Sequence, residues 1–204
     1  SADDAYFYSF SRKRRPRVLC LYGAPDFLKA PRSGYFLSRI LGGGAESLLD
    51  FDGDFLDLSL LGQARLSEYS AVLLADFKDI SPSAAGLLDS FVQRGGGLAV
   101  LPGTRLSASG LKAIESWLPA RVGPAVDSQR PQGLKARGSL LSGDFQLDRV
   151  NIARLHSLSP LAKSSVLMTN AADEPLLVVA GHGEGRVAVW ASSLDPAWST
   201  LALK

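Results

Sequence analysis

The sequence predicts an α/β fold, a doubly wound sheet of mostly parallel strands with helices between them. Short continuous apolar runs, such as Ala71–Ala75, lack polar alternation, and strands buried on both faces have this character. Segments between these runs carry apolar residues on one helical stripe, with glycines or prolines at their ends. The order strand, helix, strand, helix favours parallel strands joined by right-handed crossovers.

The first half of the chain supplies the clearest elements. A buried strand is expected at residues 18–22, because this apolar run ends at Gly23. Apolar residues at i and i+4 predict a helix over residues 33–41. A second helix begins at Ser81-Pro82, an N-cap residue followed by proline at the first helical position. Further strands are expected at residues 55–60, 71–75 and 98–101.

The second half is less regular. The helical spacing of Leu111, Ile114 and Leu118 predicts another helix, which a proline closes. Residues 121–143 have weak periodicity, so we expect loops with at most short edge elements there. A C-terminal β-hairpin is predicted, because a β-rich run at residues 176–180 is joined to another at 186–191 by a glycine-rich turn at 181–185.

Length and composition are those of one ordinary globular domain. The 204 residues are 46% hydrophobic, and 22 Lys and Arg nearly balance 20 Asp and Glu, which excludes a disordered chain. One cysteine excludes an intramolecular disulfide framework and a cysteine-based zinc site. No apolar run approaches the roughly 18 residues of a membrane span, and no secretory signal begins the sequence. The way the sequence starts and stops suggests a piece of a longer protein.

Residues 12–17 concentrate basic side chains just before the first strand. We expect residues 1–16 to be a basic linker and residues 17–204 to be a single domain. The basic run could contact nucleic acid or anionic lipid, but no aromatic stacking motif accompanies it and the remaining charge is balanced. A solvated linker, with no nucleic-acid partner, is therefore the favoured interpretation.

Candidate site residues follow the predicted strands. Asp26 and Asp76 come after two of them, and open α/β sheets bind ligands at the carboxyl ends of their strands. Both carboxylates could line one crevice, although acidic residues also occur in such loops for capping and turn formation. His156 is a further candidate, but two distant histidines are a weak metal signal, and we expect no metal site.

Several other features have simpler explanations. His182 and Glu184 are separated by one residue in the predicted turn, so they rarely orient each other and a solvated turn is expected. Cys20 lies inside an apolar strand and is predicted to be an unreactive core residue. The glycine clusters do not lie between a strand and a following helix, which argues against nucleotide binding, and we expect no cofactor.

Several phrases together resemble a known family: residues 17–23, 66–76, 91–103, 183–191 and 194–199. They are similar to the class I glutamine amidotransferase-like domain of bacterial membrane proteins of the aerotolerance-regulator (Bat) type. ThuA-like proteins are more distantly similar. The resemblance implies a flavodoxin-like three-layer α/β sandwich, held in the periplasm between membrane-spanning segments.

The resemblance also implies a missing nucleophile. True class I amidotransferases carry cysteine in a Gly-x-Cys-x-Gly elbow after a strand, with a downstream His-x-Glu. Here the corresponding turn is Pro102-Gly103-Thr104, which has neither Cys nor Ser. Thr104 and Ser107 are the nearest hydroxyls, and neither has an evident base. No catalytic residue is therefore carried over from the family.

Two function hypotheses follow. The first is a non-catalytic binding or assembly module of a membrane-anchored envelope protein, with protein partners and an unknown small-molecule ligand. The second is a ThuA-like hydrolase or sugar-processing or sugar-binding protein with a carboxylate-lined crevice, where a metal could also bind. In either case the candidate ligand-binding residues are Asp26, Asp76, Thr104 and His156.

Overall fold

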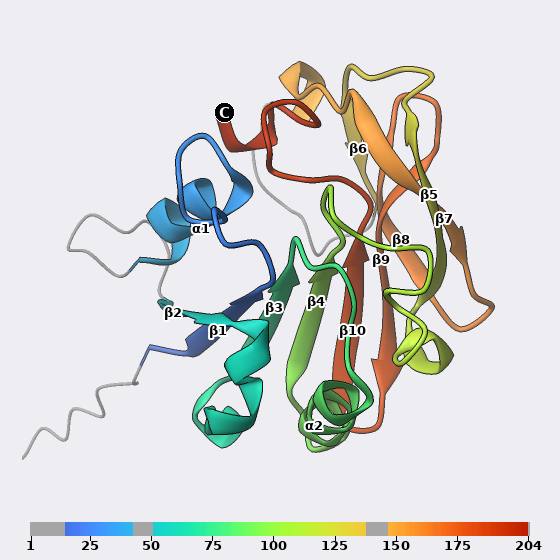
Figure 1. Cartoon of the computed structure of the whole chain (residues 1–204). Helices are drawn as coiled ribbons and strands as arrows, with labels where there is room; N and C mark the ends of the chain where they lie inside the picture. Colours follow the sequence, from blue (N-terminus) through green and yellow to red (C-terminus); the bar gives the residue numbers. More distant parts are fainter. Residues whose placement is uncertain (1–14, 43–50, 138–146, 204) are drawn as a thin grey trace, which may run out of the picture.

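A computed structural model describes residues 15–42, 51–137 and 147–203 of the chain (Figure 1). Two α-helices and ten β-strands make up the described part, with several 3-10 turns between them. In chain order the elements are β1 (Arg17–Tyr22), α1 (Ser33–Leu41), β2 (Asp52–Asp57), η1 (Leu58–Gln63), η2 (Leu66–Glu68), β3 (Ala71–Ala75), α2 (Pro82–Gln93), β4 (Gly97–Leu101), η3 (Glu115–Trp117), β5 (Ala120–Asp127), β6 (Leu134–Ala136), η5 (Leu147–Arg149), β7 (Arg154–Pro160), β8 (Ser165–Asn170), β9 (Pro175–His182), β10 (Gly185–Trp190) and η6 (Leu201–Leu203).

Eight strands form one mixed sheet in the order β2-β1-β3-β4-β10-β9-β8-β6. The five strands from β2 to β10 run parallel to their neighbours, whereas β9, β8 and β6 pair antiparallel. A second, two-stranded sheet pairs β5 with β7. The prediction of an α/β fold with a mostly parallel sheet is confirmed.

The two α-helices lie on opposite faces of the main sheet. Alternate residues of a strand point to opposite faces, and Leu19 and Leu21 pack in the core that includes α2, while Val18 and Cys20 pack in the core that includes α1. The larger core also takes in residues of β5, β7 and β9. Cys20 is fully buried, as predicted.

Helix α2 forms where its capping signals place it. The Ser81 hydroxyl accepts a hydrogen bond from the Ala84 backbone N–H at 3.2 Å, and Pro82 occupies the first turn. Ala84, Ala85, Leu88, Phe91 and Val92 supply its buried stripe. The predicted helix at 33–41 is also confirmed as α1.

Other predicted elements need correction. The strand expected at residues 55–60 is β2, which starts at Asp52 and gives way to η1 after Asp57. No α-helix forms around Ile114, where turns lead into the three-residue η3. In the described part of residues 121–143, β6 is a short edge strand of the kind expected, but most of the eight-residue β5 lies where loops were expected. The expected linker at residues 1–16 lies almost entirely outside the described residues.

The sheet topology determines where a site can form. Strands β1, β3, β4 and β10 are parallel and adjacent, so the loops that follow them meet at one edge of the sheet. The turn between β9 and β10 lies at the opposite edge, because β10 starts there. Asp26, Asp76 and Thr104 therefore belong to one edge, and His182 belongs to the other.

Candidate functional site

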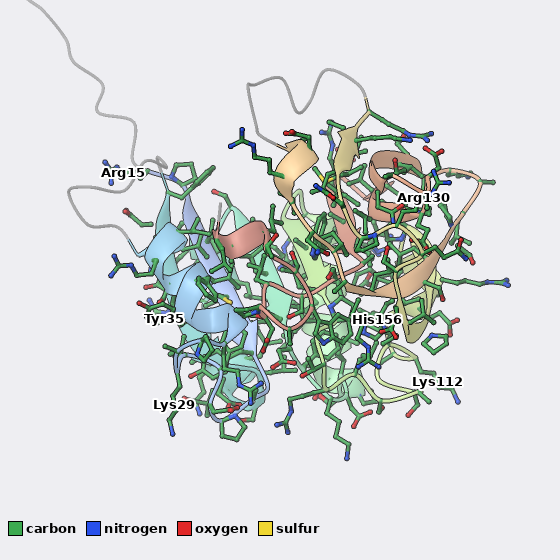
Figure 2. All side chains as sticks on the ribbon, turned by 90° about the horizontal axis from the view of Figure 1, so that it is seen from above. Arg15, Lys29, Tyr35, Lys112, Arg130 and His156 are labelled. Carbon is green, nitrogen blue, oxygen red and sulfur yellow. The ribbon has the colours of Figure 1, made fainter. Side chains whose placement is uncertain are left out.

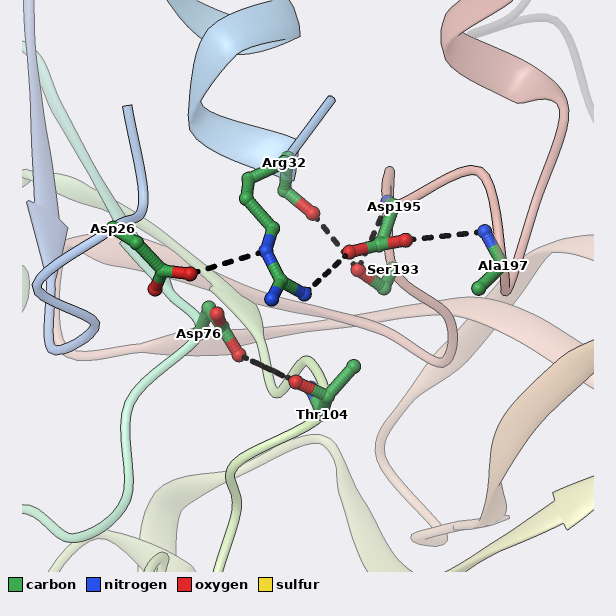
Figure 3. Close-up of polar contacts among 8 residues, drawn as sticks. Asp26, Arg32, Asp76, Thr104, Ser193, Asp195 and Ala197 are labelled. Atoms are coloured by element: carbon green, nitrogen blue, oxygen red, sulfur yellow. Dashed lines mark hydrogen bonds and ion pairs between the residues drawn. The ribbon is translucent and has the colours of Figure 1, made fainter. Parts of the chain in front are cut away.

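The loops after β1, β3, β4 and β10 form a polar cluster at the carboxyl ends of the strands (Figure 3). We call this cluster the strand-end site and define it by Asp26, Arg32, Asp76, Thr104, Ser193 and Asp195. Asp26 and Arg32 come from the loop that leads into α1, and Asp195 comes from the segment after β10. The prediction that Asp26 and Asp76 share one strand edge is supported by the topology.

Arg32 joins two of these loops. Its Nε lies 3.2 Å from Asp26 Oδ2, and its Nη1 lies 3.3 Å from Asp195 Oδ2. The hydrogen bond to Asp195, followed by the charge of Asp26, raises the pKa of the Arg32 guanidinium. Arg32 and Asp195 are not among the predicted site residues, because no sequence motif indicates that these two distant residues contact each other.

A second link joins α1 to the segment after β10. The hydroxyl oxygens of Ser33 and Ser193 lie 2.8 Å apart, and both residues are buried. Asp195 is fixed in turn, since its backbone N–H donates to Ser193 Oγ at 3.1 Å and its Oδ1 accepts from the Ala197 N–H at 3.1 Å. The site is thus cross-connected before any ligand enters.

Asp76 and Thr104 connect β3 with β4 at the same edge. Asp76 Oδ1 accepts from the Thr104 backbone N–H at 3.1 Å and lies 3.4 Å from its hydroxyl. Asp76 has φ of 43° and Gly103 has φ of 66°, a left-handed conformation that is unfavourable for Asp76. Burial raises the pKa of the Asp76 carboxyl, although the two hydrogen bonds from Thr104 oppose this shift.

A cavity beside these loops is very small. Ser33, Leu37, Asp76, Gly103 and Ser193 are among the residues around a cavity of about 10 Å³. A single water needs at least about that volume, so no small-molecule substrate fits into this cavity without movement of the loops. Asp26 and Arg32 do not line the cavity, and their side chains are 44% and 48% exposed.

His156, from β7, serves the site indirectly (Figure 2 labels it). Its side chain is buried, with Nε2 2.9 Å from the Gly103 carbonyl oxygen and Nδ1 3.0 Å from the Gly123 carbonyl oxygen. Its ring also lies against Trp198, with 5.4 Å between the ring centroids. Both ring nitrogens face backbone carbonyls, so His156 positions the Gly103 turn and presents no free nitrogen to a substrate.

His182 differs from the prediction of a solvated turn. Its Nε2 lies 2.6 Å from Asp89 Oδ1 on α2, and its ring stacks on Trp117 with 5.2 Å between centroids. Glu184 does not orient this imidazole; its backbone N–H donates to the Gln93 carbonyl. The spacing of His182 and Glu184 could not reveal this partner, because Asp89 is distant in the sequence.

Two absences apply to residues 15–42, 51–137 and 147–203. Within these ranges, no three His, Cys, Asp or Glu side chains are grouped so that they could hold a metal ion. No helix in the same part of the chain is long and apolar enough to span a bilayer.

The fold is shared with solved structures of low sequence identity. The Cytoplasmic Protein STM1381 from Salmonella typhimurium LT2 matches with a TM-score of 0.62 and 21% identity, covering 89% of this chain and 90% of that one. A ThuA-like protein from Bacteroides uniformis ATCC 8492 matches with a TM-score of 0.61 and 12% identity, covering 95% and 89%. A β-galactosidase from Bacillus circulans sp. alkalophilus has a TM-score of 0.64 and 14% identity over 88% of this chain, but only 29% of its own.

These matches define a class of fold. The protein is an α/β protein of flavodoxin-like type, and the likeness to a ThuA-like protein agrees with the more distant of the two resemblances. No model of a protein family and no curated protein matches the chain. Identities this low establish the fold alone, so the activity must be argued from the strand-end site.

Proposed function

We propose that this chain is a non-catalytic, class I amidotransferase-like domain that acts as a binding or assembly module of a membrane-anchored envelope protein. The proposed fold is a three-layer sandwich with a C-terminal β9–β10 hairpin, and the antiparallel pairing of these two strands supports the hairpin. The single observation that carries the functional proposal is the Pro102-Gly103-Thr104 turn, which has no cysteine or serine and lies beside a cavity of only about 10 Å³.

The available hydroxyls and imidazoles support a non-catalytic site. Serine and cysteine nucleophiles are commonly activated by a neighbouring histidine base. Thr104 Oγ1 faces the Asp76 carboxylate at 3.4 Å and the Ser107 hydroxyl donates to Asp79, so both hydroxyls have carboxylate partners. His156 is occupied by two backbone carbonyls, and His182 lies at the opposite sheet edge. Within the described residues, therefore, neither hydroxyl near the Gly103 turn is hydrogen-bonded to a histidine.

The proposal includes a periplasmic location, because the family resemblance implies one. The name of STM1381 describes that Salmonella protein as cytoplasmic. A fusion of the complete gene product to a reporter active only outside the cytoplasm tests the location. Reporter activity supports the proposal, and its absence from a stably expressed fusion overturns this part.

A turnover assay tests the absence of catalysis. The purified chain is incubated with L-glutamine, p-nitrophenyl acetate and p-nitrophenyl β-galactoside, in parallel with an Asp76→Asn variant. We expect no product above the buffer rate from either protein. Turnover by the natural sequence that Asp76→Asn abolishes, with its unfolding curve retained, would overturn the proposal.

One observation favours the alternative, a ThuA-like hydrolase or sugar-binding protein. Asp76, at the end of a parallel strand, has a left-handed backbone conformation and a carboxyl group with a raised pKa. Strained backbone conformations and carboxyl groups with shifted pKa values cluster at functional sites. This alternative requires the Arg32 link to open. It therefore predicts that Arg32→Ala increases turnover or ligand binding at the strand-end site, whereas our proposal predicts no change.

A further inference from the structure

A groove separate from the strand-end site lies between α2 and the segment around η3. It has a volume of about 390 Å³ and is lined in part by Pro82, Ala85, Gly86 and Asp89 of α2, and by Ser116 and Trp117. We call it the α2 groove. Most of the side chains that line it are small. His182 connects the two larger ones, because its ring stacks on Trp117 and hydrogen-bonds to Asp89. The α2 groove is thus an open surface depression whose lining includes one aromatic and one acidic side chain.

The polar groups at this end are held in place by one another. Asp89 Oδ1 lies 2.6 Å from His182 Nε2, and Gln93 Nε2 lies 3.2 Å from Asp89 Oδ2. The hydrogen bond from His182, followed by that from Gln93, lowers the pKa of the Asp89 carboxyl, despite an opposing effect of desolvation. Its side chain is 35% exposed, so a fixed carboxylate remains accessible as a hydrogen-bond acceptor.

Trp117 supplies the aromatic surface. Its ring stacks almost parallel on His182, with 16° between the ring planes, which fixes the orientation of the indole. The side chain also lines the α2 groove and is only partly buried. An indole offers a large apolar face together with an N–H donor. A ligand with one apolar face and several hydroxyls matches both properties.

Gly86 lines the α2 groove without a side chain. It lies inside α2, where glycine costs roughly 0.5–1 kcal/mol relative to alanine. A Cβ at this position would meet no atom within 4 Å, and the residue does not have positive φ. Neither packing nor backbone conformation therefore requires glycine here. The absent side chain instead leaves space along the wall of the α2 groove.

The chemistry of the lining separates the possible ligands. Among the described residues no Lys or Arg lines the groove, so an anion would find no positively charged partner among them. A purely apolar ligand would cover the Asp89 carboxylate without supplying a donor, which is unfavourable. The α2 groove is also too open to anchor a peptide side chain as a deep pocket does. Several hydroxyl donors beside an apolar face satisfy both Asp89 and Trp117.

We propose that the α2 groove binds a neutral saccharide, with its C–H face on Trp117 and its hydroxyl groups on Asp89 and Ser116. This inference rests on the proposed function only in taking the chain as a binding module. The two can fail separately, because sugar binding in the α2 groove and turnover at the strand-end site are measured by different experiments.

The test is a titration of the purified full chain, followed by the indole N–H signals of its three tryptophans in ¹H–¹⁵N NMR spectra. Galactose, mannose, N-acetylglucosamine and lactose are the probes, and Trp117→Phe identifies the Trp117 signal. We expect at least one sugar to shift that signal in a saturable manner. If none of the four sugars shifts it at up to about 50 mM, the proposal is wrong.

Two glycine substitutions provide the matched comparison. Gly86→Leu fills the groove at a helical position with free space, and Gly62→Leu adds the same side chain in η1, where a Cβ also meets no atom within 4 Å. We expect Gly86→Leu to weaken binding at least about tenfold, and Gly62→Leu to leave it unchanged. Equal affinities for the two variants overturn the assignment. A proline- and lysine-containing peptide is titrated in the same way, and its saturable binding in place of the sugars also overturns the assignment.

Discussion

Replacement of His156 by leucine tests whether this residue is structural. The buried ring faces the carbonyl oxygens of Gly103 and Gly123 at 2.9 and 3.0 Å. Leucine removes every donor, and a buried carbonyl without a partner costs about 1–3 kcal/mol. The contact with the Trp198 ring contributes about 0.5–1.5 kcal/mol more. We therefore expect the free energy of unfolding to fall by about 2–4 kcal/mol.

The assay is urea unfolding followed by far-UV circular dichroism, supported by thermal melts. For a domain of this size, each kcal/mol lowers Tm by about 2–4 °C, so the Tm of His156→Leu should fall by about 4–16 °C. His182→Leu is the matched control, because that ring is 22% exposed and has an exposed aspartate as its partner, and its cost should stay below about 1.5 kcal/mol. A loss below about 0.5 kcal/mol for His156→Leu would refute the structural role.

Three further predictions concern the core and the strand-end site. Burial raises the pKa of the Cys20 thiol to about 12, so iodoacetamide at pH 8.5 should leave Cys20 unmodified in the native protein and alkylate it in urea, as seen by mass spectrometry. Gly103→Ala places a Cβ 2.6 Å from Asp76 Oδ1 at φ 66° and should cost about 2–4 kcal/mol in urea unfolding, whereas Gly95→Ala, also at positive φ but without a neighbour within 4 Å, should cost only about 1–2 kcal/mol. The pKa of Asp76 is raised in the folded protein, so its ionisation destabilises the fold as pH rises from the unfolded-state pKa towards the folded-state pKa. The free energy of unfolding of Asp76→Asn, relative to that of the natural sequence, should therefore be higher at pH 7 than at pH 3. The opposite order would contradict this.

Sequence patterns predict the parallel part of this fold well. Continuous apolar runs locate β1, β3 and β4 within about one residue, because strands covered on both faces need apolar side chains throughout. The N-cap at Ser81 locates the start of α2. These elements depend on local signals that are present in the sequence itself.

The remaining elements depend on distant partners. Leu111, Ile114 and Leu118 are all buried, but a helix this short is marginal by itself, and the segment packs as turns. Strand β7 combines polar and apolar residues, and its pairing with β5 gives it a place in the fold. The same reason explains the site: Asp26, Asp76 and Thr104 were predictable from strand ends, whereas the Arg32–Asp195 link and the position of His156 required the tertiary structure.

The place of β10 in the sheet has a consequence for synthesis. This strand follows both β4 and β9 in the sequence, yet it lies between them in the sheet. Until it leaves the ribosome, β4 has an unpaired edge, and at roughly 5–20 residues per second this condition lasts for several seconds. An exposed strand edge can pair with another chain. Newly made molecules are thus most vulnerable to aggregation just before the last strand is inserted, a period in which chaperone binding would have its largest effect on yield.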